Sequence, residues 1–107
     1  MEMTLREICD ALNVTRRAVQ GYEKWGLVYA SGRNDRGHLL YDNKAYERIR
    51  KIRLFQDLGF SLKEIKEIID LPGEKIKPII EAQLEKRREE VECLELLTQK
   101  ICEVEAN

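Results

Sequence analysis

The chain has few of the residue types on which catalytic, metal-binding or disulfide-linked proteins depend. Its 107 residues include one histidine and three cysteines, Cys9, Cys93 and Cys102, which form no Cys-x-x-Cys pair. An odd, scattered set of thiols argues against a disulfide framework, and no Cys/His pairing or phosphate-binding loop indicates an enzyme. Cys93 and Cys102 are nine residues apart, about half a turn of rotation on a helix, so their thiols would point to opposite sides. We expect no cofactor and no metal, with a metal site shared across a dimer left open.

Long apolar segments are also absent. No apolar run approaches the roughly 20 residues that cross a membrane, and the N-terminus carries no apolar signal segment. The sequence therefore predicts a cytoplasmic protein that does not insert into a membrane. A chain of this length forms one small domain with at most an appendage, and a partner subunit would help it to bury enough apolar surface.

Charge is abundant but unevenly distributed. Charged residues make up 36% of the chain, and the formal net charge is −1. Residues 1–60 contain eleven Lys/Arg and eight Asp/Glu, whereas residues 61–107 contain eight and twelve. A basic front and an acidic back are typical of a nucleic-acid-binding face joined to a solvated helical arm.

The N-terminal sequence predicts two short helices joined by a tight turn. Residues 4–7 have the pattern of a capping box, Asn13 tolerates the left-handed conformation of a sharp turn, and Thr15 suits the start of a second helix. That helix begins with Arg16 and Arg17, although the helix macrodipole favours acidic side chains at this end. Two arginines at such a position indicate that the negative charge comes from a binding partner.

A hairpin and two further helices are predicted next. Residues 34–37 are turn residues between two short extended stretches, which indicates a β-hairpin. Asp42 caps a third helix that Gly59 ends. Residues 61–64 form a second capping box, which opens a short helix that ends before Pro72-Gly73.

The remainder is predicted to be one long helix that begins between Glu74 and Pro78, since proline fits only the first turn. Mostly apolar residues recur along it at alternating steps of four and three, which predicts a coiled-coil seam for dimerisation. The seam consists of Ile80, Leu84, Arg87, Val91, Leu94, Thr98 and Ile101. We therefore expect a head over residues 1–72 and a dimerisation helix over residues 73–107.

Two helices joined by a tight turn, the second with a basic start, and then a hairpin are the elements of a winged helix-turn-helix. In such a domain the second helix enters the major groove and its first residues meet the base edges. The predicted fold is mainly α, with a small β-hairpin wing and a long dimerisation helix. The partner that supplies negative charge to the second helix is then double-stranded DNA.

The sequence also resembles the MerR-type transcription regulators. The resemblance rests on TLREICDALNVTRRAVQGYEKWGLV (residues 4–28), RNDRGHLLYD (33–42) and IRLFQDLGFSLKEIKEII (52–69), and its most specific part is LGFSLKEI (58–65). It implies a homodimer formed by an antiparallel coiled coil on a pseudo-palindromic promoter element. Members of the family often activate transcription by bending and untwisting an overlong promoter spacer, so that RNA polymerase meets both promoter boxes.

Candidate DNA contacts lie in the second helix and the hairpin. Arg16 and Arg17 are placed for base edges, and Arg33 and Arg36 for phosphates. His38 is equally compatible with an exposed turn residue and with a phosphate or minor-groove contact. The two tyrosines of the set are expected in the core, with polar tips that reach phosphate. The full set is Thr15, Arg16, Arg17, Gln20, Tyr22, Lys24, Arg33, Arg36, His38, Tyr41 and Lys63.

Several positions depart from the family pattern. Gln20 and Gly21 stand where the family usually has arginine and tyrosine, and His38 and Leu39 stand where it favours tyrosine and arginine. Two alternatives follow: an architectural DNA-binding protein of the recombination-directionality type, and a coiled-coil interaction module with weakened DNA binding. The chain ends where family members usually continue into an effector domain, so we expect a response to its own concentration or to a partner protein.

Overall fold

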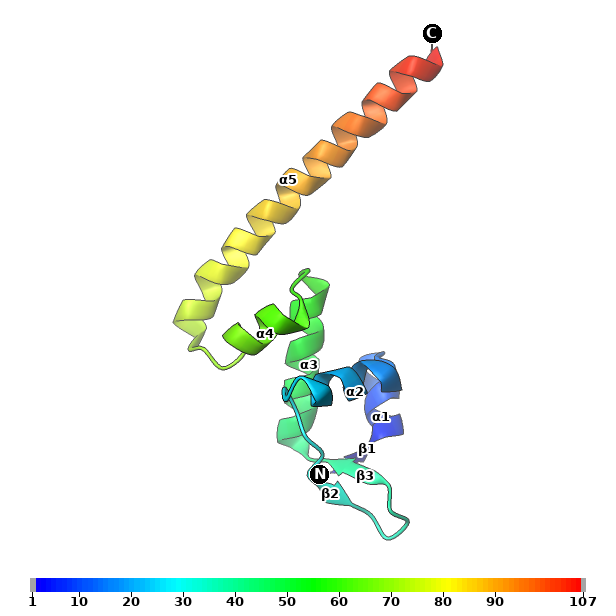
Figure 1. Cartoon of the computed structure of the whole chain (residues 1–107), viewed down its shortest axis with the longest axis vertical. Helices are drawn as coiled ribbons and strands as arrows, with labels where there is room; N and C mark the ends of the chain where they lie inside the picture. Colours follow the sequence, from blue (N-terminus) through cyan, green and yellow to red (C-terminus); the bar gives the residue numbers. More distant parts are fainter. Residues whose placement is uncertain (1, 107) are drawn as a thin grey trace. The chain divides into compact units, whose positions relative to one another are not determined.

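The chain is mainly helical and carries a small sheet near its N-terminus (Figure 1). A computed structural model describes residues 2–106 and divides into two compact units after Asp70. The elements in chain order are β1 (Met3–Thr4), α1 (Leu5–Leu12), α2 (Arg16–Lys24), β2 (Gly32–Arg33), β3 (Leu39–Tyr41), α3 (Asn43–Asp57), α4 (Leu62–Ile68) and α5 (Gly73–Ala106). The predicted fold class is confirmed. We call residues 2–70 the head.

The first two helices begin and end where their caps predict. The Thr4 hydroxyl accepts from the Glu7 N–H at 3.2 Å, and the Glu7 carboxylate accepts from the Thr4 N–H at 3.1 Å, which completes a capping box. Asn13 has φ 52°, so the chain turns sharply after α1. The Thr15 hydroxyl then accepts from the Ala18 N–H at 3.0 Å and opens α2.

The hairpin belongs to a three-stranded antiparallel sheet of order β1-β3-β2. β2 and β3 pair with Gly32 opposite Leu40, and the turn between them closes with a 2.9 Å bond from the Gly37 N–H to the Asn34 carbonyl. The hairpin is confirmed, whereas β1 was not predicted. Two residues directly before a capped helix carry no strand pattern, and they pair because β3 has a free edge beside them.

α3 forms the centre of the core of the head. Its Ile49 and Ile52 are fully buried, and Phe55 packs edge-on against Phe60 with ring centroids 5.7 Å apart. The other helices, the hairpin and the loops bury their apolar side chains with these residues. Those with 2% exposure or less are Ile8, Val19, Tyr22, Leu27, Tyr41, Ile65 and Ile69.

Basic side chains of α3 bind carbonyl groups of the head itself. Arg53 donates from Nη1 to the Asn13 carbonyl at 2.6 Å, and Arg48 donates from Nε to the Leu27 carbonyl. These two carbonyls lie just before and just after α2. Arg48 also pairs with Asp70 at 2.7 Å, and this hydrogen bond holds the pKa of that carboxyl below its usual range. These arginines are therefore part of the scaffold.

α5 begins earlier than the sequence predicts. The Ile76 N–H donates to the Pro72 carbonyl at 3.1 Å, so the helix starts at Gly73 and Pro78 falls in its second turn. The prediction of a start between Glu74 and Pro78 is therefore wrong by at least one residue. Proline has no N–H, so the carbonyl of Glu74 has no partner four residues on. Glu74 is exposed, and water can satisfy that carbonyl.

The predicted seam lies on α5 as one stripe of side chains that stays open in a single copy of the chain. Leu84 is 40% exposed, Val91 52%, Leu94 63% and Ile101 62%. A contiguous apolar stripe of this kind is characteristic of an interface.

The core of the head predicts a contrast between two neighbouring residues of α3. Ile52→Ala should lower the free energy of unfolding by about 2–5 kcal/mol, because it leaves a cavity in a fully buried position. Leu54→Ala is the control, since Leu54 is 52% exposed and its loss should cost less than about 1 kcal/mol. Urea denaturation followed by circular dichroism measures both values. Equal losses would contradict the placement of α3.

Candidate nucleic-acid interface

α2 buries one face and presents the other to solvent. Val19 and Tyr22 are 0% and 1% exposed and fix the helix on the core. A Cβ added at Gly21 would meet nothing within 4 Å, so the space beside the polar face is open. Five of the six predicted contact residues of this helix and its cap are exposed, and they are Thr15, Arg16, Arg17, Gln20 and Lys24; the sixth is the buried Tyr22.

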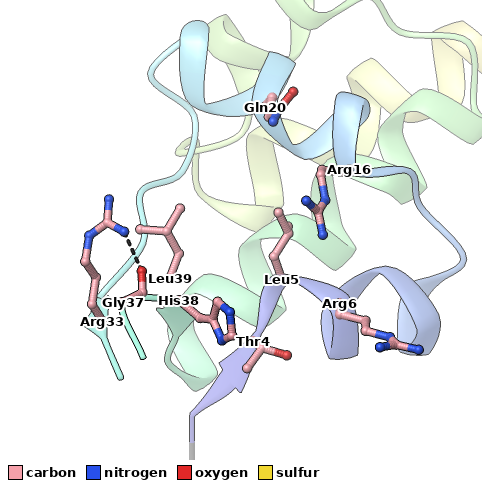
Figure 2. Close-up of a pocket in the computed structure, with 9 residues that line it drawn as sticks. All are labelled: Thr4, Leu5, Arg6, Arg16, Gln20, Arg33, Gly37, His38 and Leu39. Carbon is pink, nitrogen blue, oxygen red and sulfur yellow. Dashed lines mark hydrogen bonds between the residues drawn. The ribbon is translucent and has the colours of Figure 1, made fainter. Parts of the chain in front are cut away.

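The hairpin holds its basic side chains through a network around Asn34. The Asn34 side-chain oxygen accepts from the N–H groups of Arg36 at 3.0 Å and His38 at 2.9 Å. Arg33 donates from Nη1 to the Gly37 carbonyl at 2.6 Å (Figure 2), which leaves its other donors for a partner. Gly37 has φ 80°, a left-handed conformation that favours glycine at this turn.

A cleft of about 530 Å³ lies between the start of α1, the polar face of α2 and the hairpin. Figure 2 shows Arg16 and Gln20 entering it from α2, with Arg33 and His38 on the hairpin side. Arg6 of α1 completes the lining charges, and none of the nine lining residues is acidic. The cleft is therefore electropositive and suits a phosphate-bearing ligand.

The structure separates the predicted set into groups. Arg16, Gln20, Arg33 and His38 line the cleft together. The remaining exposed residues of the set lie outside the cleft lining, and they are Thr15, Arg17, Lys24, Arg36 and Lys63.

The two tyrosines of the predicted set need a correction. Tyr22 and Tyr41 are each 1% exposed, which agrees with a place in the core but leaves no polar tip at the surface. Tyr22 donates its hydroxyl to Gln56 Oε1 at 2.6 Å, and Tyr41 donates to Glu23 Oε1 at 2.5 Å. Burial, aided for Tyr41 by the Glu23 bond, raises the pKa of both phenols, so they remain neutral donors. Both hydroxyls serve the scaffold.

Arg6 is the cationic cleft residue that the sequence reasoning missed. It lies inside the capping box of α1, where the pattern indicates only a helix start. No local signal marks it, because the two residues of β1 before this helix carry no strand pattern. β1 pairs with β3, and this pairing brings the first turn of α1 beside the hairpin.

Within residues 2–106, no group of three or more His, Cys, Asp or Glu side chains is arranged to hold a metal ion. In the same part of the chain, no helix is both long and apolar enough to cross a membrane.

A capped helix-turn-helix, a basic hairpin and a shared electropositive cleft define a winged helix-turn-helix DNA-binding domain. Two family models match this chain. The model described as MerR HTH family regulatory protein matches residues 3–71, and the model described as MerR, DNA binding matches residues 46–107. The chain belongs to the MerR family of transcription regulators, as the resemblance in the sequence implies.

Known relatives agree with this assignment. Nodulation protein NolA of Bradyrhizobium sp. (strain NC92) is 44% identical over 64 residues, which cover 60% of this chain and 27% of that protein. The HTH-type transcriptional activator mta of Bacillus subtilis (strain 168) is 31% identical over 85 residues, which cover 79% of this chain and 33% of that protein. A MerR family transcriptional regulator from Bacillus cereus has a similar structure, with a TM-score of 0.82 and 29% identity over 96% of this chain and 79% of that chain.

This chain thus spans a third or less of the length of these two curated relatives. The Bacillus subtilis and Bacillus cereus relatives are transcription regulators, and the comparisons favour neither the architectural protein nor the interaction module that has lost DNA binding.

The scaffold role of the Tyr22 hydroxyl can be tested by removing its oxygen atom. Tyr22→Phe should lower the free energy of unfolding by about 0.5–1.5 kcal/mol, because the bond to Gln56 is lost. DNA affinity, measured well below the melting temperature, should not change. Tyr29→Phe is the matched control, since Tyr29 is 69% exposed. A large loss of DNA affinity in Tyr22→Phe would indicate that this hydroxyl contacts DNA and would contradict the scaffold role.

Proposed function

We propose that this chain binds a pseudo-palindromic promoter element as a homodimer and regulates transcription by distorting the bound DNA. The observation that carries the proposal is the cleft, in which Arg16 of the recognition helix faces the same space as Arg33 and His38 of the wing. A winged domain grips a duplex from two sides when helix and wing share one positive face. RNA polymerase at the same promoter is the proposed downstream partner.

The exposed residues divide into two roles. Arg16, Arg17 and Gln20 stand on the first turns of α2, where side chains reach base edges in the major groove. Arginine forks two donors onto guanine, and the Gln20 amide both donates and accepts, as adenine requires. The remaining exposed cations of the predicted set, together with Arg6 of the cleft, hold phosphates and set the register on the duplex. They are Arg6, Lys24, Arg33, Arg36 and Lys63, with His38 beside them.

Dimerisation through α5 supplies a second recognition helix for the other half-site of the operator. MerR-family relatives bind DNA and act as dimers. The stripe on α5 exposes several large apolar side chains, and full burial of each would contribute roughly 1.5–3 kcal/mol. Two antiparallel copies would present two recognition helices to a two-fold operator.

The base-reading role of α2 predicts a loss of specificity. The Arg16→Ala/Arg17→Ala variant should lose about 1–3 kcal/mol of operator binding for each base contact and should discriminate less at the matching positions. Arg33→Ala should instead lower the affinity for all duplexes equally. It should also reduce the slope of log affinity against log salt concentration by about one. Fluorescence anisotropy at several salt concentrations measures both effects. Arg50→Ala is the control, because Arg50 pairs with Glu47 outside the cleft lining.

Footprinting at the chain's own promoter supplies the operator for these measurements. Equal binding of the wild type and the Arg16/Arg17 variant would refute base reading by α2. Absence of salt-dependent duplex binding in the wild type would support an interaction module instead.

The dimerisation role of α5 predicts a separable monomer. Leu84→Asp with Leu94→Asp should give a folded monomer that loses operator-specific binding but keeps weak, salt-sensitive attraction to DNA. Leu96→Asp is the matched control, since Leu96 is 59% exposed but lies off the seam. Sedimentation at micromolar concentration measures the state of each variant. A monomeric wild type would overturn the dimer and the two-fold operator with it.

A further inference from the structure

The seam of α5 has an uneven pattern of polarity. Arg87 and Thr98 are polar positions in an otherwise apolar stripe. An open groove of about 430 Å³ runs along one flank of the stripe. Its lining residues are Leu84, Arg87, Arg88, Val91, Glu92 and Glu95. The floor is thus apolar, and opposite charges stand seven residues apart on the flank, at Arg88 and Glu95.

Heptad geometry restricts how this surface can meet a second copy of itself. Along the seam, Leu84, Val91 and Thr98 are each reached by a step of four residues, and Arg87, Leu94 and Ile101 by a step of three. In an antiparallel pair, a position of the first kind lies opposite a position of the second kind on the other helix. The pairing can therefore shift only by whole heptads. A two-fold axis relates the copies, so every layer occurs twice and any mismatch is doubled.

We infer that two copies of α5 pair with the two-fold axis between Glu92 and Cys93. The inference rests on the proposed antiparallel dimer and specifies its register. Leu84 then lies opposite Ile101 of the partner subunit, Val91 lies opposite the partner's Leu94, and Arg87 lies opposite the partner's Thr98. Six of the seven seam positions form consecutive matched layers, apolar with apolar and polar with polar, and Ile80 lies beyond them, opposite position 105 of the partner subunit.

The polar layer is chemically complementary. The Thr98 hydroxyl donates to the Leu94 carbonyl of its own helix at 2.9 Å, so its oxygen remains an acceptor. Arg87 has only donors. A guanidinium opposite this hydroxyl oxygen can therefore donate one hydrogen bond to it inside the seam, while its other N–H groups reach solvent at the flank.

The flanking charges agree with the same register. Arg88 meets Glu95 of the partner subunit, and the symmetry repeats this pair on the other half of the coil. In the single helix Arg88 bonds Glu85 at 3.3 Å, an exposed contact that leaves further donors on the guanidinium. Opposite charges at flanking positions select partner and orientation in coiled coils.

The neighbouring registers bring unlike layers and like charges together. A shift of one heptad toward the N-terminus places Arg87 opposite Val91 of the partner subunit, and it brings Arg88 against the partner's Arg88. A shift toward the C-terminus places Leu94 opposite the partner's Thr98 and brings Glu95 against the partner's Glu95. Both registers bury a polar group against an apolar one and place repulsion at the axis.

A charge exchange tests the flanking pair. Arg88→Glu and Glu95→Arg should each weaken dimerisation by roughly tenfold, because each creates two like-charge contacts. The double exchange should restore the wild-type dissociation constant, measured by sedimentation equilibrium. Lys86→Glu, a charge reversal on the outer face of α5, is the matched control and should change little. Failure of the exchange to rescue a wild-type dimer would overturn the register.

A distance across the dimer tests the axis independently of charge. With Cys9→Ala and Cys93→Ser, a spin label on the exposed Cys102 reports one distance per dimer by pulsed electron resonance. The two labels should be about 29 Å apart along the helix axis, against about 39 Å and about 18 Å in the shifted registers. Either shifted value would overturn the register while the dimer stands. A parallel dimer would place the labels side by side, and a monomer would give no distance, so these outcomes would refute the proposed dimer itself.

Discussion

The head depends on the way α3 holds the recognition helix at both ends and in the middle. Arg53 binds the Asn13 carbonyl in the turn before α2, and Arg48 binds the Leu27 carbonyl in the loop after it. Between them, Gln56 accepts the hydroxyl of the buried Tyr22. The two arginine bonds are charge-assisted and satisfy backbone carbonyls that the turns leave without helical partners. A recognition helix fixed in this way can present its arginines without reordering on binding.

The wing is tied to the same helix by the hydrogen bond between Tyr41 and Glu23. Tyr41 of β3 donates to Glu23 of α2, and this bond helps to hold the hairpin and the recognition helix in place around the cleft between them. The neutral phenol is a suitable link, because burial raises its pKa and it stays a donor throughout the physiological range. The basic residues at the tip of the hairpin are then free to face a duplex while the base of the hairpin stays in the core.

Local patterns predicted much of this architecture. The capping boxes at Thr4 and Ser61, the left-handed Asn13 and the cap at Asp42 all lie where the sequence predicts, since each depends on residues within one turn. Features that depend on contacts between residues far apart in the sequence were missed or predicted wrongly. β1 was not predicted because its only support is the edge of β3, and Arg6 was overlooked because its neighbours in the cleft are far away in sequence. Tyr22 and Tyr41 were expected to reach phosphate because a sequence cannot show which acceptor a buried hydroxyl finds.

The sequence by itself determined the kind and order of the elements: a capped helix-turn-helix, a hairpin, and a long helix with a heptad stripe. These follow from caps, turn residues and periodicity, which act over a few residues. The tertiary structure alone decided which basic side chains belong to the scaffold and which face solvent. Arg48 and Arg16 are the same residue type in two helices, yet one binds an internal carbonyl and the other lines the cleft. Only the packing of α2 against α3 distinguishes them, because the role of a charge depends on which orphan carbonyls and which open spaces the folded chain places around it.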